Sequence, residues 1–240
     1  MDEPAILVAQ VHKRYGDVVA VDDVSLRVEP GEVVALVGAN GAGKTSTVEM
    51  VAGLRTPDRG RISVLGLDPR RDRAALRQVL GVQLQEPYLH HALTVAELVD
   101  LYRSFYRDPR AAAELLDMVE LTEHRTTRFE KLSGGQQQRL SIALALVGRP
   151  RVVILDELTT GLDPRARRRV WAAIDALREE TVLLVSHAMD EVERLCDRVA
   201  VLHHGRIVAL GPPAELNAAA GAASLEETFM ALTGTEPEER

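Results

Sequence analysis

Apolar and polar positions in the first third of the chain predict short strands and one helix. Four short runs are rich in β-branched residues and are bounded by turn residues, and they lie at 6–11, 24–28, 32–37 and 61–65. A glycine-rich loop at 38–43 follows the third run. Apolar residues at helical spacing then predict a helix over 44–52, which ends before Gly53.

The middle of the chain, about 86–148, has the apolar periodicity of helices instead. Thr94 and Glu97 have the spacing of a capping box at the start of one helix. The pair Asp108-Pro109 fits the N-cap and first position of a second helix, and a third is predicted over 134–147. These patterns predict a helical lobe inserted into a mixed α/β frame.

The last third returns to alternating strands and helices. Fully apolar runs at 152–155 and 182–185 predict buried strands, and a hairpin is predicted over 199–210. Helices are predicted to begin at Asp163-Pro164 and to span 188–195. Continuous apolar strands that alternate with helices indicate a buried, mainly parallel sheet, and therefore an α/β fold. Ser224 and Glu227, in the tail, have the spacing of another capping box.

Composition and charge narrow the function classes. The net charge of −7 argues against a general affinity for nucleic acid, because phosphate binding needs a basic face. The single cysteine, Cys196, allows no disulfide within the chain, which fits a reducing cytoplasm. No apolar run reaches the roughly 20 residues that cross a bilayer. If the protein works at a membrane, we expect it to act through a partner that spans it.

Residues 38–45, Gly-Ala-Asn-Gly-Ala-Gly-Lys-Thr, match the phosphate-binding P-loop pattern between a predicted strand and a predicted helix. Glycines let backbone N–H groups point inward, and the helix N-terminus adds positive potential. We expect Lys44 to reach the β- and γ-phosphates of ATP and the Thr45 hydroxyl to ligate Mg²⁺. The chain has 26 Arg and only three Lys, so the presence of Lys at this position indicates that Lys is required there. A compact ammonium fits inside such a loop, whereas a broad guanidinium would not. The nucleotide contacts expected here are Gly38, Asn40, Gly41, Ala42, Gly43, Lys44, Thr45 and Ser46.

A second nucleotide motif ends the apolar strand at 152–155. Asp156 comes at the carboxyl end of that strand, where α/β sheets place their ligands, and we expect it to hold Mg²⁺. Glu157 follows, and its carboxylate suits a general base that orients the attacking water.

The segment Leu132-Ser-Gly-Gly-Gln136 indicates a second helix start that could bind an anion. Ser133 suits an N-cap, and Gly134 and Gly135 expose the backbone N–H groups of the helix that follows. The P-loop already supplies one helix start for the phosphates, so a single nucleotide bound to one chain does not need a second anion-binding helix start. At this point the sequence resembles the ATP-binding cassettes of ABC transporters, whose signature is Leu-Ser-Gly-Gly-Gln, and the resemblance covers about residues 5–234.

The resemblance implies a head-to-tail homodimer. The signature residues of one copy, Ser133, Gly134, Gly135 and Gln136, would close on the γ-phosphate held by the P-loop of the other copy. It also implies that Asp163 lies in the D-loop at the dimer interface.

Three more site residues are implied by the same resemblance. Gln85 matches the Q-loop glutamine that contacts Mg²⁺ and the attacking water, Tyr15 matches the aromatic that stacks on adenine, and His187 matches the switch histidine that contacts the γ-phosphate. Gln83 is expected to be an ordinary strand residue. Leu158 stands where the family usually has proline, so the backbone after Glu157 is less constrained than usual.

The implied architecture is a single ABC ATPase domain over 1–240. It would combine a P-loop ATPase core lobe with an antiparallel β subdomain (1–85 and 149–210), a helical signature lobe (86–148) and a short tail (211–240). ATP binding would close the dimer and hydrolysis would reopen it.

The sequence around Gly81–Gln85 and Ser224–Gly234 is most similar to cassettes of drug, antibiotic or lipid exporters. This implies ATP hydrolysis coupled to export through a separate membrane permease, with the cassette in the cytoplasm on the inner face of the membrane. Two alternatives stay open. One is a soluble ABC ATPase outside transport, although those families carry paired cassettes, coiled-coil insertions or zinc-binding cysteines. The other is a regulatory module that binds nucleotide without turnover.

Overall fold

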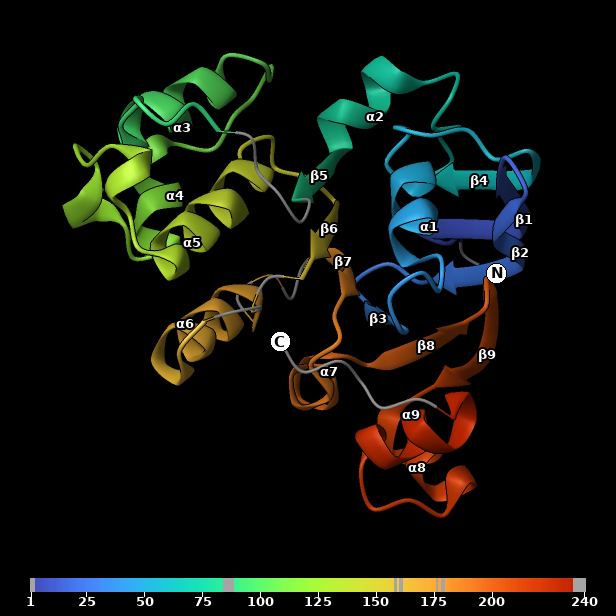
Figure 1. Cartoon of the computed structure of the whole chain (residues 1–240). Coiled ribbons are helices and arrows are strands. Elements are labelled where there is room, and N and C mark those ends of the chain that lie inside the picture. The colour runs from blue at the N-terminus through green and yellow to red at the C-terminus, as the bar shows by residue number, and fades with distance from the viewer. Residues whose placement is uncertain are drawn as a thin grey trace.

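The computed structural model describes residues 3–83, 89–157, 159, 162–175, 177 and 180–234. Gln85 and Leu158 therefore lie outside the described residues. Within the described part, no helix combines the length and the apolar character needed to cross a membrane. Figure 1 shows a group of helices, α3 to α5, on one side of the central strands, and a small antiparallel sheet on the other.

The small sheet is antiparallel, with strand order β2-β1-β4. Its strands are β1 (Ile6–Tyr15), β2 (Val18–Val28) and β4 (Arg59–Val64). The sequence pattern predicted only the apolar ends of the β1–β2 hairpin. Both strands continue to the turn at Gly16-Asp17, because cross-strand pairing through several irregular steps also includes the polar residues.

The main sheet has strand order β5-β6-β7-β3-β8-β9. Its strands are β5 (Leu80–Gln83), β6 (Val152–Asp156), β7 (Thr181–Val185), β3 (Val33–Val37), β8 (Arg198–His203) and β9 (Arg206–Gly211). The first five are parallel and only β9 runs antiparallel to its neighbour. Every residue of β3, β6 and β7 is buried. The predicted α/β fold, with a mainly parallel sheet and a separate antiparallel part, is confirmed.

The helices are α1 (Lys44–Val51), α2 (Arg73–Val79), α3 (Val95–Arg103), α4 (Ala112–Met118), α5 (Gly134–Ala145), α6 (Pro164–Asp175), α7 (Met189–Leu195), α8 (Pro213–Ala220) and α9 (Leu225–Thr233). Two short 3₁₀ turns, η1 (Thr122–His124) and η2 (Phe129–Lys131), precede α5. The lobe boundaries expected from the sequence stay a prediction.

Side chains on the main sheet alternate between two cores, as the period of two along a strand requires. Val33, Ala35 and Val37 of β3 belong to the core that includes α3, α4, α5 and α7. Val34 and Leu36 belong to the core that includes the antiparallel sheet and α1. Helices α1 and α5 therefore pack on opposite faces of the main sheet.

The predicted start of the second lobe helix at Asp108-Pro109 is wrong. Helix α4 begins at Ala112, and its N-cap residue Ala111 is extended and makes no side-chain cap. The backbone N–H of Arg110 donates to the carbonyl of Val147 at 2.8 Å, which holds this segment in an extended path. A tertiary contact thus overrides the local helix-start signal.

The two predicted capping boxes of α3 and α9 cap their helices, with one difference between them. Thr94 and Glu97 form a complete capping box on α3. The Ser224 hydroxyl accepts from the Glu227 N–H at the start of α9, but the Glu227 carboxylate accepts from Ala223 rather than from Ser224. Helices α8 and α9 pack together below β9 in Figure 1.

Candidate functional site

The glycine-rich loop connects the carboxyl end of β3 to the N-terminus of α1, as the motif predicted. Gly41 and Gly43 have positive φ values of 78° and 105°, a region that L side chains rarely adopt. A Cβ atom at Gly43 would lie 2.2 Å from the carbonyl oxygen of Ala20, and one at Gly38 would lie 2.5 Å from that of Leu202. Both glycines are therefore required where β2 and β8 brace the loop.

Lys44 is 6% exposed and closes the loop on itself. Its Nζ donates to the carbonyl oxygens of Gly38 at 2.6 Å and Ala39 at 3.2 Å. The loop thus places a buried ammonium beside the backbone N–H groups of a helix start, an arrangement suited to a phosphate chain. Thr45 and Asn40 are exposed, and Ser46 and Ala42 are more covered.

Asp156 is the last residue of β6 and is 3% exposed. Burial, and after it the Glu157 carboxylate, raise the pKa of its carboxyl group, the Lys44 ammonium opposes them, and the resulting pKa is about 6. Lys44 is close enough to Asp156 to lower the pKa of its carboxyl group, so this strand end lies near the glycine-rich loop. A buried carboxylate and an exposed threonine hydroxyl are hard oxygen donors, the kind that Mg²⁺ takes.

Glu157 and His187 extend from neighbouring strand ends. Oε1 of Glu157 and Nδ1 of His187 are 3.5 Å apart. The backbone N–H of Glu157 donates to Val185 at 2.8 Å, which ties the ends of β6 and β7 together. Glu157 has a φ of 50°, a conformation that costs a non-glycine residue about 1–3 kcal/mol and is concentrated at functional sites.

Gln83 is a strand residue, as expected, but it makes a contact with the site region that sequence reasoning did not predict. It is the last residue of β5 and is buried, with an exposed fraction of 4%. Its Oε1 accepts from the backbone N–H of Asp156 at 3.0 Å. The only sequence signal was a polar residue at the end of an otherwise apolar strand.

The second glycine-rich motif forms the N-terminus of α5. Ser133 and Gln136 make a complete capping box, in which the Gln136 side chain accepts from the Ser133 N–H at 2.8 Å. The acceptor is Oε1 of Gln136, and Nε2 of the same Gln136 amide lies 2.8 Å from Nε2 of His124. Gly134 is exposed with open space beside it, whereas a Cβ at Gly135 would lie 2.9 Å from Ala166 of α6.

Two further predicted residues lie at the edges of this region. Tyr15 ends β1, is 37% exposed, and has the cationic groups of Lys13 and Arg55 each 5.4 Å from its ring centroid. Asp163 caps α6 by accepting from the N–H groups of Arg165 at 2.8 Å and Ala166 at 3.0 Å, which lowers the pKa of its carboxyl group.

The loop, Asp156, Glu157 and His187 therefore meet at the carboxyl edge of the main sheet, where open α/β sheets bind ligands. The start of α5 stands apart from them, because α1 and α5 cover opposite faces of that sheet. Figure 1 shows the two helices separated by β5 and β6.

Comparison with known proteins shows the family of the chain. Residues 21–160 match the family model described as "ABC transporter". The "Nod factor export ATP-binding protein I" of Rhizobium etli is 39% identical over 219 residues, covering 88% of this chain and 69% of that protein. The protein of the same name from Paraburkholderia xenovorans is 40% identical over 237 residues, covering 95% and 78%.

Two solved structures are also similar. An ATP-binding subunit of an ABC transporter has 30% identity and a TM-score of 0.86, over 95% of this chain and 99% of that one. An ATP-binding cassette in a dimeric post-hydrolysis state, bound to ADP and Pi, has 26% identity and a TM-score of 0.78, over 86% and 98%. The chain therefore belongs to the ABC transporter family, in which it is an ATP-binding subunit and an ATPase.

Proposed function

We propose that two copies of this chain sandwich Mg-ATP between the P-loop of one and the signature of the other, and that hydrolysis powers export through a separate membrane permease. The observation that carries the chemistry is the approach of Glu157 Oε1 and His187 Nδ1 to 3.5 Å at adjacent strand ends, beside the buried Asp156. A general base needs such a partner to fix its orientation.

Lys44, the loop N–H groups and the N-terminus of α1 would bind the phosphates, and Tyr15 would stack on the adenine. Thr45 and Asp156 supply the oxygen donors for Mg²⁺, whose charge would offset that of the β- and γ-phosphates. Gln85 would complete this site, and it lies outside the described residues. Asp156 would hold the metal in its ionised form, so a bound metal would oppose the protonation that burial favours.

Glu157 would accept a proton from the attacking water while its backbone stays tied to β7 through Val185. His187 would contact the γ-phosphate and hold the Glu157 carboxylate in place. The site excludes water on its inner side, because the strands behind it are fully buried.

The head-to-tail dimer is supported by the position of the signature. Within one chain the start of α5 and the P-loop belong to elements on opposite faces of the sheet, so a second copy would supply the missing anion-binding helix start. Gly134 is open to such a partner. Asp163, on the neighbouring loop, would lie at the same interface.

Export through a permease is supported by the relatives, whose printed names describe export of Nod factor for those proteins. For this chain we infer a drug, antibiotic or lipid-like cargo and a position on the cytoplasmic face of the membrane. Segment 85–106 would face the permease. The exposed side chains of Leu101 and Phe105, on and just after α3, support that assignment.

The test is the solution mass of Glu157→Gln with and without Mg-ATP, because this variant should bind ATP without hydrolysing it. We expect a shift from monomer to dimer with Mg-ATP, and loss of that shift when Ser133→Phe is added. Ser224→Phe is the matched control, since Ser224 also caps a helix by accepting from the N–H three residues on. A monomer under both conditions, with ATP bound, would refute the sandwich for the isolated chain.

A further inference from the structure

Glu191 of α7 is a fully buried carboxyl group close to the proposed catalytic residues. Its exposed fraction is 0%. Three neutral side chains donate to it: Ser186 Oγ at 2.6 Å, Trp171 Nε1 at 3.0 Å, and the Thr159 hydroxyl. Burial raises the pKa of Glu191, and these three hydrogen bonds oppose that rise.

The three donors come from three different segments around the site. Ser186 directly precedes His187, Thr159 follows Glu157 by two residues, and Trp171 belongs to α6. Helix α6 begins beside Asp163, whose carboxylate caps it. A single side chain thus joins the turn that carries His187, the hydroxyl of Thr159, and helix α6.

The contact with Ser186 also shapes the turn that carries His187. Ser186 Oγ donates to Glu191 and accepts from the backbone N–H of Ala188 at 3.1 Å, so its hydroxyl bridges across His187. On the other side, His187 faces Glu157 at 3.5 Å. The position of the imidazole is therefore set from both sides, and Glu191 holds one of them.

A buried carboxyl group is a costly way to join a helix to a sheet, because apolar side chains would do so without desolvation. The carboxylate makes directional hydrogen bonds, so each of its three donors is held in one geometry. We propose that Glu191 is a positioning residue for ATP hydrolysis, which holds the His187 turn and Thr159 in fixed relation to α6. This inference rests on the roles proposed above for Glu157 and His187.

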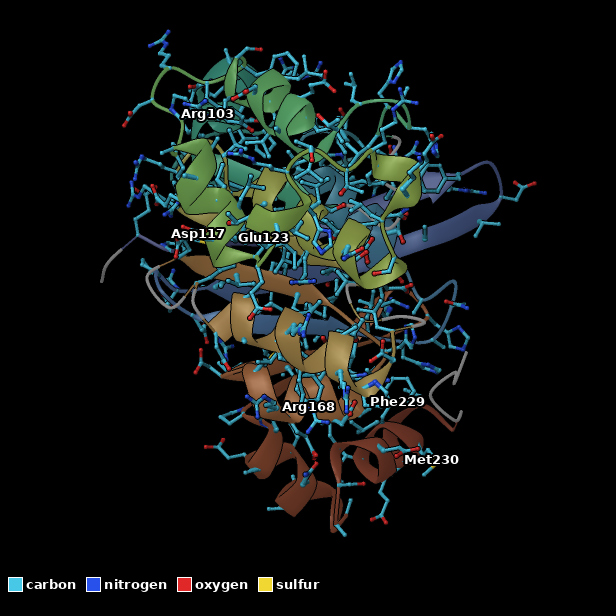
Figure 2. The ribbon with its side chains drawn as sticks, turned by 90° about the vertical axis from the view of Figure 1, so that its left-hand side faces the viewer. Arg103, Asp117, Glu123, Arg168, Phe229 and Met230 are labelled. Atoms are coloured by element: carbon cyan, nitrogen blue, oxygen red, sulfur yellow. The ribbon has the colours of Figure 1, made fainter. Side chains whose placement is uncertain are left out.

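The neighbouring Asp190 provides a matched control. It also links α7 to α6, through an ion pair with Arg167 at 3.1 Å, but its side chain is 58% exposed. Figure 2 shows the outer face of α6, with Arg168 labelled, between the helices that carry Asp117 and Glu123 and the tail with Phe229 and Met230. Asp190→Asn should remove a surface link between the same two helices and leave the buried network intact.

The first measurement is the steady-state kinetics of ATP hydrolysis by wild type, Glu191→Leu, Glu191→Gln and Asp190→Asn. Glu191→Leu should lower kcat by about tenfold or more, because small misplacements of catalytic groups have effects of that order. Its KM for ATP should change by less than about twofold, because no phosphate contact is lost. Glu191→Gln should recover part of kcat, since its amide oxygen can still accept from Trp171. Asp190→Asn should match wild type.

The second measurement uses Trp171, the only tryptophan in the chain, and does not depend on turnover. In the Glu157→Gln background, Mg-ATP should change the emission of Trp171, because its indole N–H is bonded to the network that holds His187. Adding Glu191→Leu should abolish that change, and adding Asp190→Asn should preserve it. An unchanged response with Glu191→Leu would overturn the proposal.

Ser186→Ala provides a variant with a smaller effect on folding, since it removes one donor and leaves no buried hole larger than a hydroxyl. It should lower kcat in the same direction. A folded Glu191→Leu or Ser186→Ala protein with wild-type kcat and lower thermal stability would show a purely structural role and refute the inference. Absence of hydrolysis in wild type, or hydrolysis that survives Glu157→Gln, would instead refute the proposed function.

Discussion

The side-chain carbonyl of Gln83 accepts a hydrogen bond of 3.0 Å from the backbone N–H of Asp156. Both groups are buried at the junction of β5 and β6, whose paired registers end at Gln83 and Leu155. The amide side chain therefore continues the ladder one residue beyond the last paired residues. It fixes the backbone from which the Asp156 carboxylate projects.

Gln83→Leu should lower the affinity of the site for Mg²⁺. The variant leaves the Asp156 N–H without its acceptor, which costs about 1–3 kcal/mol of stability. We expect a several-fold higher Mg²⁺ concentration for half-maximal ATP hydrolysis, with little change at saturating Mg²⁺. Gln78→Leu is the control, because the Gln78 amide accepts from Arg107 at 3.3 Å, away from the site. An equal shift in both variants would contradict the prediction.

Lys44→Met should abolish tight nucleotide binding, because the variant removes the buried ammonium inside the loop. Loss of one partner from a buried charged contact costs about 2–5 kcal/mol, which corresponds to an ATP affinity lower by about 30-fold or more. Lys44→Arg should also bind weakly, because the larger guanidinium does not fit between Gly38 and Ala39. Calorimetric titration with ATP measures both. The exposed Lys131→Met should bind as wild type does, and tight binding by Lys44→Arg would show that charge alone suffices.

Two adjacent glycines of α5 should respond oppositely to alanine. Gly135→Ala places a Cβ 2.9 Å from that of Ala166, so α5 and α6 must separate, and we expect a loss of about 1–3 kcal/mol. Gly134→Ala meets nothing within 4 Å and should be neutral or stabilising by up to about 1 kcal/mol. Thermal unfolding without nucleotide measures both. Equal melting temperatures of the two variants would mean that α6 can move away from the added methyl group without loss of stability.

The stability of the nucleotide-free protein should fall as pH rises through 6. The pKa of Asp156 is raised from 3.8 to about 6 by burial, so the folded state binds more protons than the unfolded state between these values. The stabilisation is fully present below 3.8 and is lost as pH rises through 6, with an upper limit of about 3 kcal/mol. Urea unfolding of wild type and Asp156→Asn from pH 4 to 7.5 isolates this group. We expect the free energy of unfolding of Asp156→Asn, relative to that of wild type, to increase from pH 4 to 7.5. A difference that stays constant with pH would contradict the assignment.

The sequence by itself determined the P-loop, the buried strand that ends in Asp156-Glu157, the capped start of α5, and the cap of α6 at Asp163. Each of these features is encoded by contiguous residues, since backbone conformation, helix starts and strand burial depend on local residue type and spacing. The family resemblance added His187 and Tyr15, whose types alone carry no such information.

Only the tertiary structure decided which distant residues support the site. Helix α4 begins at Ala112 because Arg110 bonds to Val147, Gln83 bonds to Asp156, and Glu191 bonds to Ser186. These contacts join residues on different elements, so their formation depends on how the elements pack. A buried polar side chain must find partners wherever the fold places them, and a local pattern cannot name those partners.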